Sequence, residues 1–252
     1  MTMLRALLPC SFLFMVGCAE TTDASPDEVG ASDEAIVDGA DTFEHPEIGL
    51  LHNGGSYCTA TLIRPNVVLT AAHCVTGGHK DEAVTGYSFD IKPSSSVAAT
   101  RFEIDRAYTV PVAADFDGTQ TWRLKDIALL RLTTPVPATL AEPLAVATSR
   151  PSAGADTIIF GYGCTSRKAD ANGHRPGGGV KRKAELTWSS TELGSGASSH
   201  VCPGDSGGPW LDVAAGAVFG TTSGIVNGDD RFGDVPANAA EINRAADAWG
   251  AP

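Results

Sequence analysis

Short apolar runs separated by turn-forming residues recur along the chain from residue 47 to residue 226. Several alternate apolar and polar positions, which is the pattern of a β-strand with one buried face. The 28 glycines and 15 prolines favour tight turns between the runs. The expected strands are Glu47–His52, Tyr57–Ile63, Val67–Ala71, Val84–Phe89, Phe102–Val110, Ile127–Leu132, Thr157–Tyr162, Glu185–Trp188, Pro209–Asp212 and Val218–Val226. Short strands at this spacing predict an all-β fold of the sandwich or barrel type.

One segment near the C-terminus has helical periodicity instead. Ile242, Ala245, Ala246 and Trp249 fall on one helical face. The residues from Asn238 to Glu241 are similar to a capping box. We therefore expect one short helix, beginning at about Asn238 and packed on the β-structure.

The first 18 residues have the pattern of an export signal. Arg5 is followed by an apolar run, Ala6 to Val16, that is too short to span a bilayer as a helix. The run ends in Met15-Val16-Gly17-Cys18, which resembles a bacterial lipobox with Cys18 as the acylated residue. The alternative is an ordinary secretory signal with an incidental cysteine. We expect export from a bacterial cell, either as an outer-membrane lipoprotein attached through Cys18 or as a secreted protein.

Residues 19–35 differ from the rest of the chain in composition. They contain six acidic residues (Glu20, Asp23, Asp27, Glu28, Asp33 and Glu34), no basic residue and one sizeable apolar side chain, Val29. Such a segment cannot bury enough apolar surface to fold alone, so we expect a flexible acidic tether or propeptide. The whole chain has a formal charge of −12, which argues against a nucleic-acid partner.

Three segments carry candidate catalytic chemistry. The turn Gly204-Asp205-Ser206-Gly207-Gly208-Pro209 presents a serine hydroxyl, Leu69–Cys74 contains His73, and Asp126 precedes the apolar residues Ile127 to Leu130. A serine hydroxyl is a weak nucleophile at neutral pH and needs a neighbouring base that a third group orients. The chain offers all three groups.

In the order His, Asp, Ser, and together with Ile36-Val37-Asp38-Gly39, these segments resemble the chymotrypsin/trypsin-like serine proteases. The resemblance extends from Ile36 to Trp249. It implies two six-stranded antiparallel β-barrels with the active site between them and a crossover near Pro135–Pro151. The domains would then be a signal peptide (1–18), the tether or propeptide (19–35) and the protease domain (36–252). It implies protein or peptide substrates, a monomer, no cofactor and no metal.

The resemblance also assigns roles. His73 takes the proton of Ser206 and returns it to the leaving amine, while Asp126 orients the imidazole. The backbone N–H groups of Gly204 and Ser206 form the oxyanion hole.

Activation follows from the same resemblance. Asp205 would receive the new α-ammonium group of Ile36 after cleavage of the Ala35–Ile36 bond, so the chain is expected to be a zymogen. Ala35 is not the Arg or Lys that activating proteases often require. Either the enzyme processes itself or another peptidase with small-residue preference activates it, unless the mature chain begins elsewhere.

The substrate pocket departs from the trypsin pattern. His200 stands where trypsin-like enzymes place an aspartate, so Arg or Lys specificity is not expected. Ser223 keeps the contact with substrate backbone, Gly224 removes an aromatic wall, and Ile225 obstructs the pocket. Small apolar residues are the favoured substrates. The rival is an acidic side chain bound by protonated His200.

Four cysteines remain once Cys10 and Cys18 are assigned to the leader. Cys58 and Cys74 match the disulfide that the family has beside its catalytic histidine. Cys164 and Cys202 are then left to pair with each other, with free thiols as the alternative.

Together these features predict a serine endopeptidase. The alternatives are a non-catalytic protease homologue that acts as a surface binding module, and an esterase that uses the same triad.

Overall fold

The computed structural model describes residues 36, 39–75, 80–111, 125–189, 200–226 and 229–250. The chain divides into two units, Met1–Ala31 and Ser32–Pro252. The expected signal peptide, Cys18 and the tether all lie outside the described residues. In the described part of the chain, the structure has no helix whose length and apolar character would allow it to cross a membrane.

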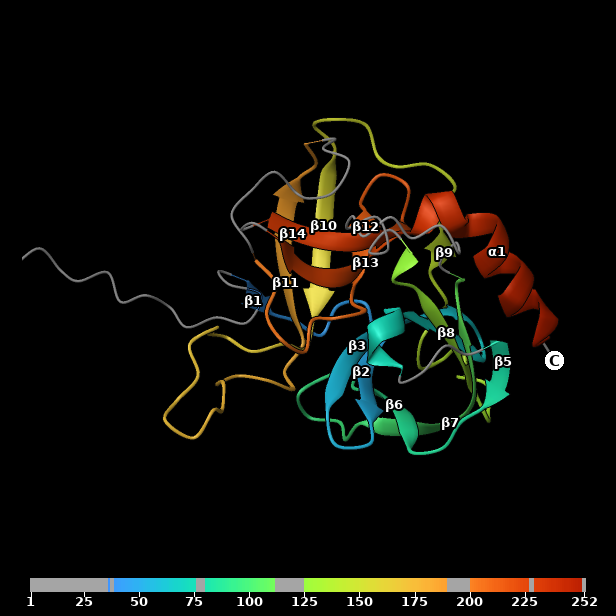
Figure 1. Ribbon diagram of the computed structural model, residues 1–252, viewed down its shortest axis with the longest axis horizontal. Coiled ribbons are helices and arrows are strands. Elements are labelled where there is room, and N and C mark those ends of the chain that lie inside the picture. Colours follow the sequence, from blue (N-terminus) through green and yellow to red (C-terminus); the bar gives the residue numbers. More distant parts are fainter. Residues whose placement is uncertain are drawn as a thin grey trace, which may run out of the picture. The chain divides into compact units, whose positions relative to one another are not determined.

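The first sheet of the second unit is a closed ring of six antiparallel strands (Figure 1). The ring runs β7-β6-β2-β3-β4-β8 and closes where β8 pairs with β7, and β5 adds to β7 from outside the ring. With β5 the sheet has seven strands: β2 (Ile48–Asn53), β3 (Tyr57–Arg64), β4 (Val67–Thr70), β5 (Lys80–Ala83), β6 (Tyr87–Ile91), β7 (Thr100–Thr109) and β8 (Ala128–Leu132).

The second sheet follows the order β1-β11-β10-β12-β13-β14, and β9 pairs with β13 in parallel. Its strands are β1 (Ala40–Asp41), β9 (Ala145–Val146), β10 (Asp156–Gly161), β11 (Arg182–Thr187), β12 (Pro209–Asp212), β13 (Ala217–Val226) and β14 (Asp229–Asp234). Within the described residues this ladder does not close on itself. The chain passes between the sheets from Leu132 to Ala145, inside the stretch that is rich in proline.

The expected fold class is confirmed: the protein is mostly β, with two barrel-like sheets and one C-terminal helix. Four strands were not predicted. In β5 every residue is exposed, and in β14 two acidic residues precede an arginine, so neither strand has the apolar alternation that signals β-structure. The other two, β1 and β9, have only two residues each.

The predicted start of the helix was wrong. Helix α1 spans Val235–Ala248, and Asp234 is its N-cap, with a side chain that accepts a hydrogen bond from the Ala237 N–H. Pro236 lies in the first turn, where its missing N–H has no cost. Asn238 instead donates its side-chain amide to the Asp234 carbonyl. An aspartate followed by a proline two residues later was the better start signal.

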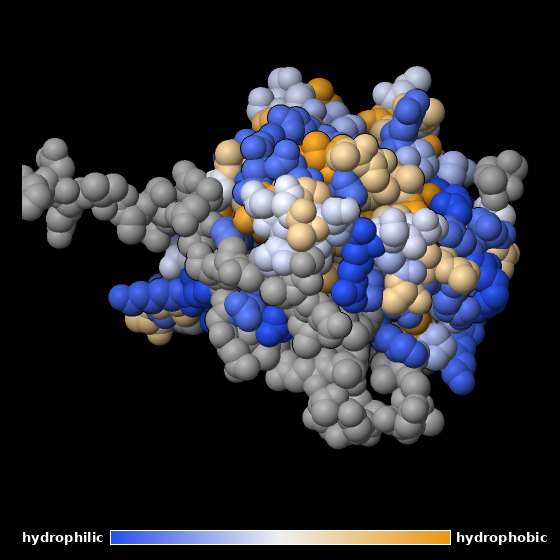
Figure 2. All heavy atoms as spheres, turned by 90° about the horizontal axis from the view of Figure 1, so that it is seen from above, coloured by the Kyte–Doolittle hydropathy of each residue, from blue (hydrophilic) through white to orange (hydrophobic). Residues whose placement is uncertain are grey.

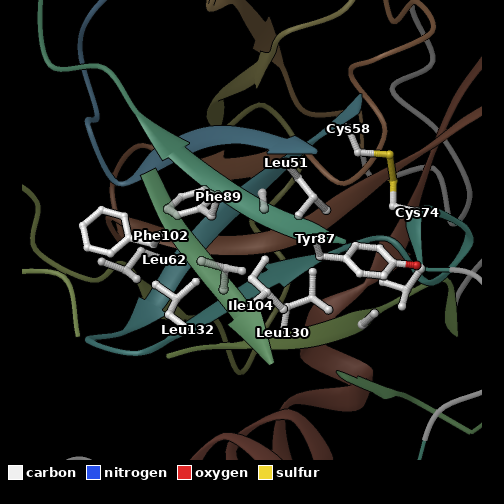
Figure 3. Close-up of a cluster of buried hydrophobic side chains, with 14 of the residues drawn as sticks. Leu51, Cys58, Leu62, Cys74, Tyr87, Phe89, Phe102, Ile104, Leu130 and Leu132 are labelled. Atoms are coloured by element: carbon white, nitrogen blue, oxygen red, sulfur yellow. A yellow bond between two sulfur atoms is a disulfide. The ribbon is translucent and has the colours of Figure 1, made fainter. Parts of the chain in front are cut away.

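Three buried clusters stabilise this architecture. One fills the first barrel and includes Leu62, Phe89 and Leu130, whose side chains point toward one another in Figure 3. A second is rich in aromatic rings and includes Trp188, Trp210, Phe219 and Phe232. The third cluster combines residues of both sheets with the apolar face of α1. Its members include Leu69, Leu129, Phe160, Val218 and Ile242. The two sheets and the helix therefore share one interface.

Candidate active site

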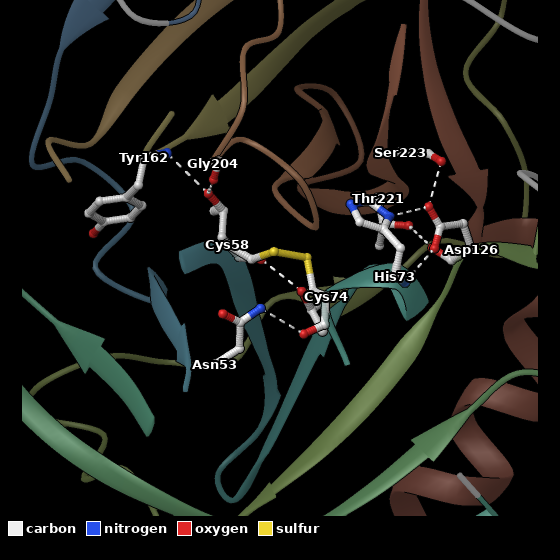
Figure 4. Close-up of a disulfide and its surroundings, with 11 residues drawn as sticks. Asn53, Cys58, His73, Cys74, Asp126, Tyr162, Gly204, Thr221 and Ser223 are labelled. Carbon is white, nitrogen blue, oxygen red and sulfur yellow. Dashed lines mark hydrogen bonds and ion pairs between the residues drawn. A yellow bond between two sulfur atoms is a disulfide. The ribbon is translucent and has the colours of Figure 1, made fainter. Parts of the chain in front are cut away.

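The pairing of β4 with β8 brings His73 and Asp126 together. Thr70, at the end of β4, faces Ala128, at the start of β8. His73 lies three residues after Thr70, in the short 3₁₀ turn Ala72–Cys74, and Asp126 lies two residues before Ala128. The His73 ring Nδ1 is 2.7 Å from Asp126 Oδ2, and the His73 backbone N–H donates to Oδ1 over 2.9 Å (Figure 4).

Asp126 is buried, and further donors surround it. The Ser223 hydroxyl donates to Oδ2 over 2.5 Å, and the Thr221 hydroxyl donates to the Asp126 carbonyl over 3.1 Å. Burial acts to raise the pKa of the Asp126 carboxyl, but the hydrogen bond and charge of His73, with the Ser223 bond, outweigh it and lower the pKa. The carboxylate is therefore ionised at neutral pH, while the His73 side chain remains 39% exposed.

Ser206 lies on a turn in which two nearby positions, 204 and 207, have backbone angles that favour glycine. Gly204 and Gly207 have φ values of +104° and +80°. A Cβ at Gly204 would lie 2.4 Å from the Tyr57 ring, and one at Gly207 would lie 2.1 Å from the Thr70 hydroxyl. The nucleophile turn therefore packs directly against strands β3 and β4 of the first sheet.

Strand β3 connects the turn that carries Ser206 with the turn that carries His73, through one hydrogen bond and one disulfide. The Thr59 N–H donates to the Ser206 carbonyl over 2.8 Å. Cys58, the preceding residue, is bonded to Cys74, which follows His73. Within the described residues, no hydrogen bond joins the Ser206 hydroxyl to the His73 ring. His73 and Asp126 thus form a direct pair, and Ser206 is linked to them through backbone.

Asp205 is a buried carboxylate, and within the described residues its hydrogen-bond donors are backbone N–H groups. Its Oδ1 accepts from Gly163 N over 2.7 Å and its Oδ2 from Cys202 N over 2.8 Å. Burial raises the pKa of Asp205 to about 7, and the two backbone bonds and the charge of Arg182 only partly oppose this shift. No ion pair with Asp205 occurs in the part of the chain that the structure describes. Ile36 is buried in the aromatic cluster that also contains Val201.

His200 has a buried partner that the sequence did not reveal. Asp230, on β14, accepts from His200 N over 2.8 Å, from Val201 N over 3.2 Å and from the His200 ring Nδ1 at 3.3 Å. Asp230 is 0% exposed. In the sequence, Asp230 is one charged residue between two others, Asp229 and Arg231. It could have been identified as a buried partner only if β14 had been predicted as a strand, with position 230 on its inward face.

The other pocket residues lie together at the end of β13. The strand is irregular between Thr222 and Gly224, where Gly224 has a φ of +139°. Ser223 is buried and its hydroxyl bonds Asp126, while Ile225 pairs with Asp230 across the ladder. On the face of the molecule shown in Figure 2, polar and apolar residues are interspersed. The side chain of Ile225 is 36% exposed. Ile225 is therefore available to a bound molecule.

Both expected disulfides are present. Cys58–Cys74 and Cys164–Cys202 have Cα–Cα distances of 6.2 and 5.4 Å. The ligand atoms of Cys58, His73 and Cys74 lie within 4.8 Å of one another. Because both sulfurs are in the disulfide, they offer no thiolate to a metal.

Comparison with known proteins identifies the family. The family model described as Trypsin matches residues 36–248. The protein C activator of Agkistrodon piscivorus leucostoma is 31% identical over 194 residues, which cover 71% of this chain and 73% of the relative. Kallikrein 1-related peptidase b26 of Mus musculus is 27% identical over 201 residues, 70% of this chain and 73% of the relative.

Solved structures share the fold. Mouse neuropsin, described as a serine protease, superposes with a TM-score of 0.62 at 22% identity, over 83% of this chain and 99% of its own. An inactivated protease paralogue of the scabies mite reaches 0.64 at 16% identity, over 85% and 97%. Because a serine protease and an inactivated protease paralogue both share this fold, the fold alone does not establish activity.

Proposed function

Because the chain belongs to the trypsin family of serine proteases, we propose that it is a serine endopeptidase with Ser206 as nucleophile, His73 as general base and Asp126 as the orienting carboxylate. The observation that carries the proposal is the doubly hydrogen-bonded pair of His73 and buried Asp126. This arrangement fixes the proton on Nδ1 of the ring, so that Nε2 is free to accept the proton of an attacking alcohol.

The reaction proceeds through an acyl-enzyme. The Ser206 oxygen bonds to the scissile carbonyl carbon as its proton moves to His73 Nε2, and the oxyanion is held by the N–H groups of Gly204 and Ser206. His73 then gives that proton to the leaving amine as the peptide bond breaks. Water, deprotonated by the same nitrogen, hydrolyses the ester. Asp126 stabilises the imidazolium throughout and keeps its own charge.

The chain is made as an inactive precursor. In the intact chain, the nitrogen of Ile36 is a peptide nitrogen and cannot neutralise Asp205. Cleavage of the Ala35–Ile36 bond creates an α-ammonium group for this carboxylate, and the ion pair orders the turn that carries Ser206. Ala35 suits an enzyme that cleaves after small residues, whether that enzyme is this protein or another peptidase.

The primary pocket selects small apolar side chains. Ile225 stands exposed beside it and restricts its size. The Asp230 carboxylate does not convert the pocket to Arg or Lys specificity, because two backbone N–H groups and the His200 ring occupy it and no part of it is exposed. The rival substrate is an acidic side chain bound by a protonated His200, whose ring Nδ1 lies 3.3 Å from Asp230 Oδ2.

Export and lipid attachment through Cys18 rest on residues 1–18 alone. The relatives described above come from a snake and a mouse, and they give no support for a bacterial source. Two further relatives, from Bothrops insularis and Gloydius brevicauda, are named as snake venom serine proteases, which is compatible with a secreted protein.

A fluorophosphonate probe tests the function directly. The chain cleaved at Ala35–Ile36 should react with it and digest casein, whereas Ser206→Ala should do neither while unfolding at the same temperature. The expected loss is about 10⁶-fold in turnover. A cleaved wild-type chain that fails to react would contradict the proposal and favour the non-catalytic homologue. Reaction with the probe and with esters, but without casein digestion, would favour the esterase.

A further inference from the structure

We propose that Thr59 is a positioning residue for the oxyanion hole, because its hydroxyl fixes the turn that carries the two N–H donors. The inference rests on the proposed function, since those donors matter only if Ser206 attacks a carbonyl. Thr59 comes from the first sheet, whereas Gly204 and Ser206 immediately precede the second sheet's strand β12.

Every polar group of Thr59 is hydrogen-bonded, although the residue is 0% exposed. Its hydroxyl donates to the Gly204 carbonyl over 2.9 Å and accepts from Tyr162 N over 3.0 Å. Its backbone N–H donates to the Ser206 carbonyl over 2.8 Å, and its carbonyl accepts from the Thr70 hydroxyl over 2.9 Å. A buried polar group with complete hydrogen bonding specifies one arrangement, because any other leaves groups unpaired.

These bonds hold the nucleophile turn at both ends. Gly204 has no Cβ to restrict its backbone, so the peptide plane after it can rotate unless something outside the turn holds its carbonyl. The Thr59 hydroxyl does this, and the Tyr57 ring lies against the same glycine. The two held carbonyls belong to the peptide units 204–205 and 206–207, which lie on either side of the unit that carries the Ser206 N–H, so one residue restricts the backbone around that donor from both sides.

The same strand also reaches the base. Cys58, next to Thr59, is bonded to Cys74, next to His73, and Figure 4 shows Gly204 and Tyr162 on one side of this disulfide with His73 and Asp126 on the other. Strand β3 therefore sets the position of the oxyanion donors relative to the imidazole. A displacement of about 1 Å at such a site can cost about 100-fold in rate.

Thr61 provides a matched control two residues further along β3. It is as buried as Thr59, at 1% exposure, but its hydroxyl has no hydrogen-bond partner in the described part of the chain. Removing the Thr61 hydroxyl thus changes the same strand and the same residue type without touching the nucleophile turn.

The test compares Thr59→Ala with Thr59→Ser in the chain cleaved at Ala35–Ile36, with Thr61→Val as control. The first two variants differ only in the hydroxyl. For a peptide amide substrate, we expect kcat to fall by about 10- to 100-fold in Thr59→Ala, with little change in KM. Thr59→Ser and Thr61→Val should stay within about threefold of wild type. Affinity for a peptidyl trifluoromethyl ketone, whose serine adduct carries an oxyanion, should fall in parallel with kcat.

A second readout does not depend on catalysis. Backbone amide exchange in a peptide that covers residues 203–208 should be faster in Thr59→Ala than in Thr59→Ser and unchanged in Thr61→Val. Equal rates and equal exchange in all variants would overturn the inference. The inference would also be overturned if active-site titration showed that the whole fall in kcat of Thr59→Ala comes from a smaller fraction of active molecules, because the role of Thr59 would then be structural. An inactive wild-type chain would contradict the proposed function instead, and the exchange result would still decide the role of Thr59.

Discussion

Asp230 illustrates how one buried side chain can hold a binding loop. Two backbone N–H groups and one ring nitrogen converge on its carboxylate, and water has no access to it. An unsatisfied buried donor costs about 1–3 kcal/mol. The carboxylate therefore stabilises the segment that leads from His200 to Ser206, which is the floor of the proposed pocket.

Replacing Asp230 by alanine should consequently destabilise the protein by about 2–6 kcal/mol, because two backbone donors lose their acceptor. Urea denaturation followed by fluorescence measures the change. Asp229→Ala is the control, since Asp229 is half-buried and pairs with Arg231 at 3.4 Å; that change should cost less than about 1 kcal/mol. Equal midpoints for the two variants would show that Asp230 does not stabilise the loop.

Sequence analysis found the residues whose chemistry depends on a local motif and missed those whose partners come from distant strands. His73, Asp126 and Ser206 each lie in a short segment that is informative by itself. Thr59 and Asp230 do not. A threonine in a strand and an aspartate between two charged residues look ordinary until the fold places Gly204 beside one and His200 beside the other.

At the scale of elements, helix α1 depends on a cap that also belongs to an ion pair. Asp234 Oδ1 accepts from Ala237 N over 3.3 Å, and Arg150 donates to Asp234 Oδ2 over 2.6 Å. The cap satisfies one of the first N–H groups of the helix. The ion pair ties the helix start to the segment between β9 and β10.

Asp234→Ala should lower the free energy of unfolding by about 1–2 kcal/mol through loss of the cap, with a further loss from the ion pair. Asp234→Asn separates the two effects, because asparagine is an equally good N-cap but carries no charge for Arg150. Thermal unfolding of both variants, with helix content from circular dichroism, provides the measurement. If Asn and Ala destabilise equally, the cap contributes nothing and the helix start is held by packing alone.

Element boundaries were predictable where apolar residues were concentrated between turn signals, as in β2, β3 and β8. They were not predictable in β14, where the inward positions include Asp230, or in β5, whose side chains are all exposed. In such strands the ladder and the neighbouring strand determine the conformation. Local preference then has little influence.

At the scale of the molecule, the proposed site depends on contacts between two sheets that are far apart in sequence. The order of the three motifs indicated this architecture, but the ring closure of the first sheet and the open ladder of the second come only from the structure. The proposed activation also concerns the molecule as a whole, and Asp205 is the group on which it would depend.

In the intact chain, Asp205 is buried and forms no ion pair within the described residues, and burial raises its pKa from 3.8 to about 7. The folded precursor therefore binds this proton more tightly than the unfolded chain does. Protonated Asp205 adds stability that is complete below about pH 4 and is lost as the pH rises to about 7, a change of roughly 4 kcal/mol. Asparagine at this position has no such dependence. In a Ser206→Ala background, which cannot cleave itself, the precursor with Asp205 should thus match Asp205→Asn at pH 4 and be clearly less stable at pH 8.

Cleavage before Ile36 should reverse that order. The new α-ammonium group gives the carboxylate a partner, so at pH 7 the cleaved chain with Asp205 should be more stable than cleaved Asp205→Asn, because loss of one member of a buried ion pair typically costs 3–5 kcal/mol. Denaturation curves of all four proteins between pH 4 and pH 8 provide the comparison. If cleavage leaves the difference between Asp205 and Asn unchanged at pH 7, the α-ammonium group does not reach this carboxylate. Activation would then require another explanation, because the buried charge would remain unpaired in the cleaved chain.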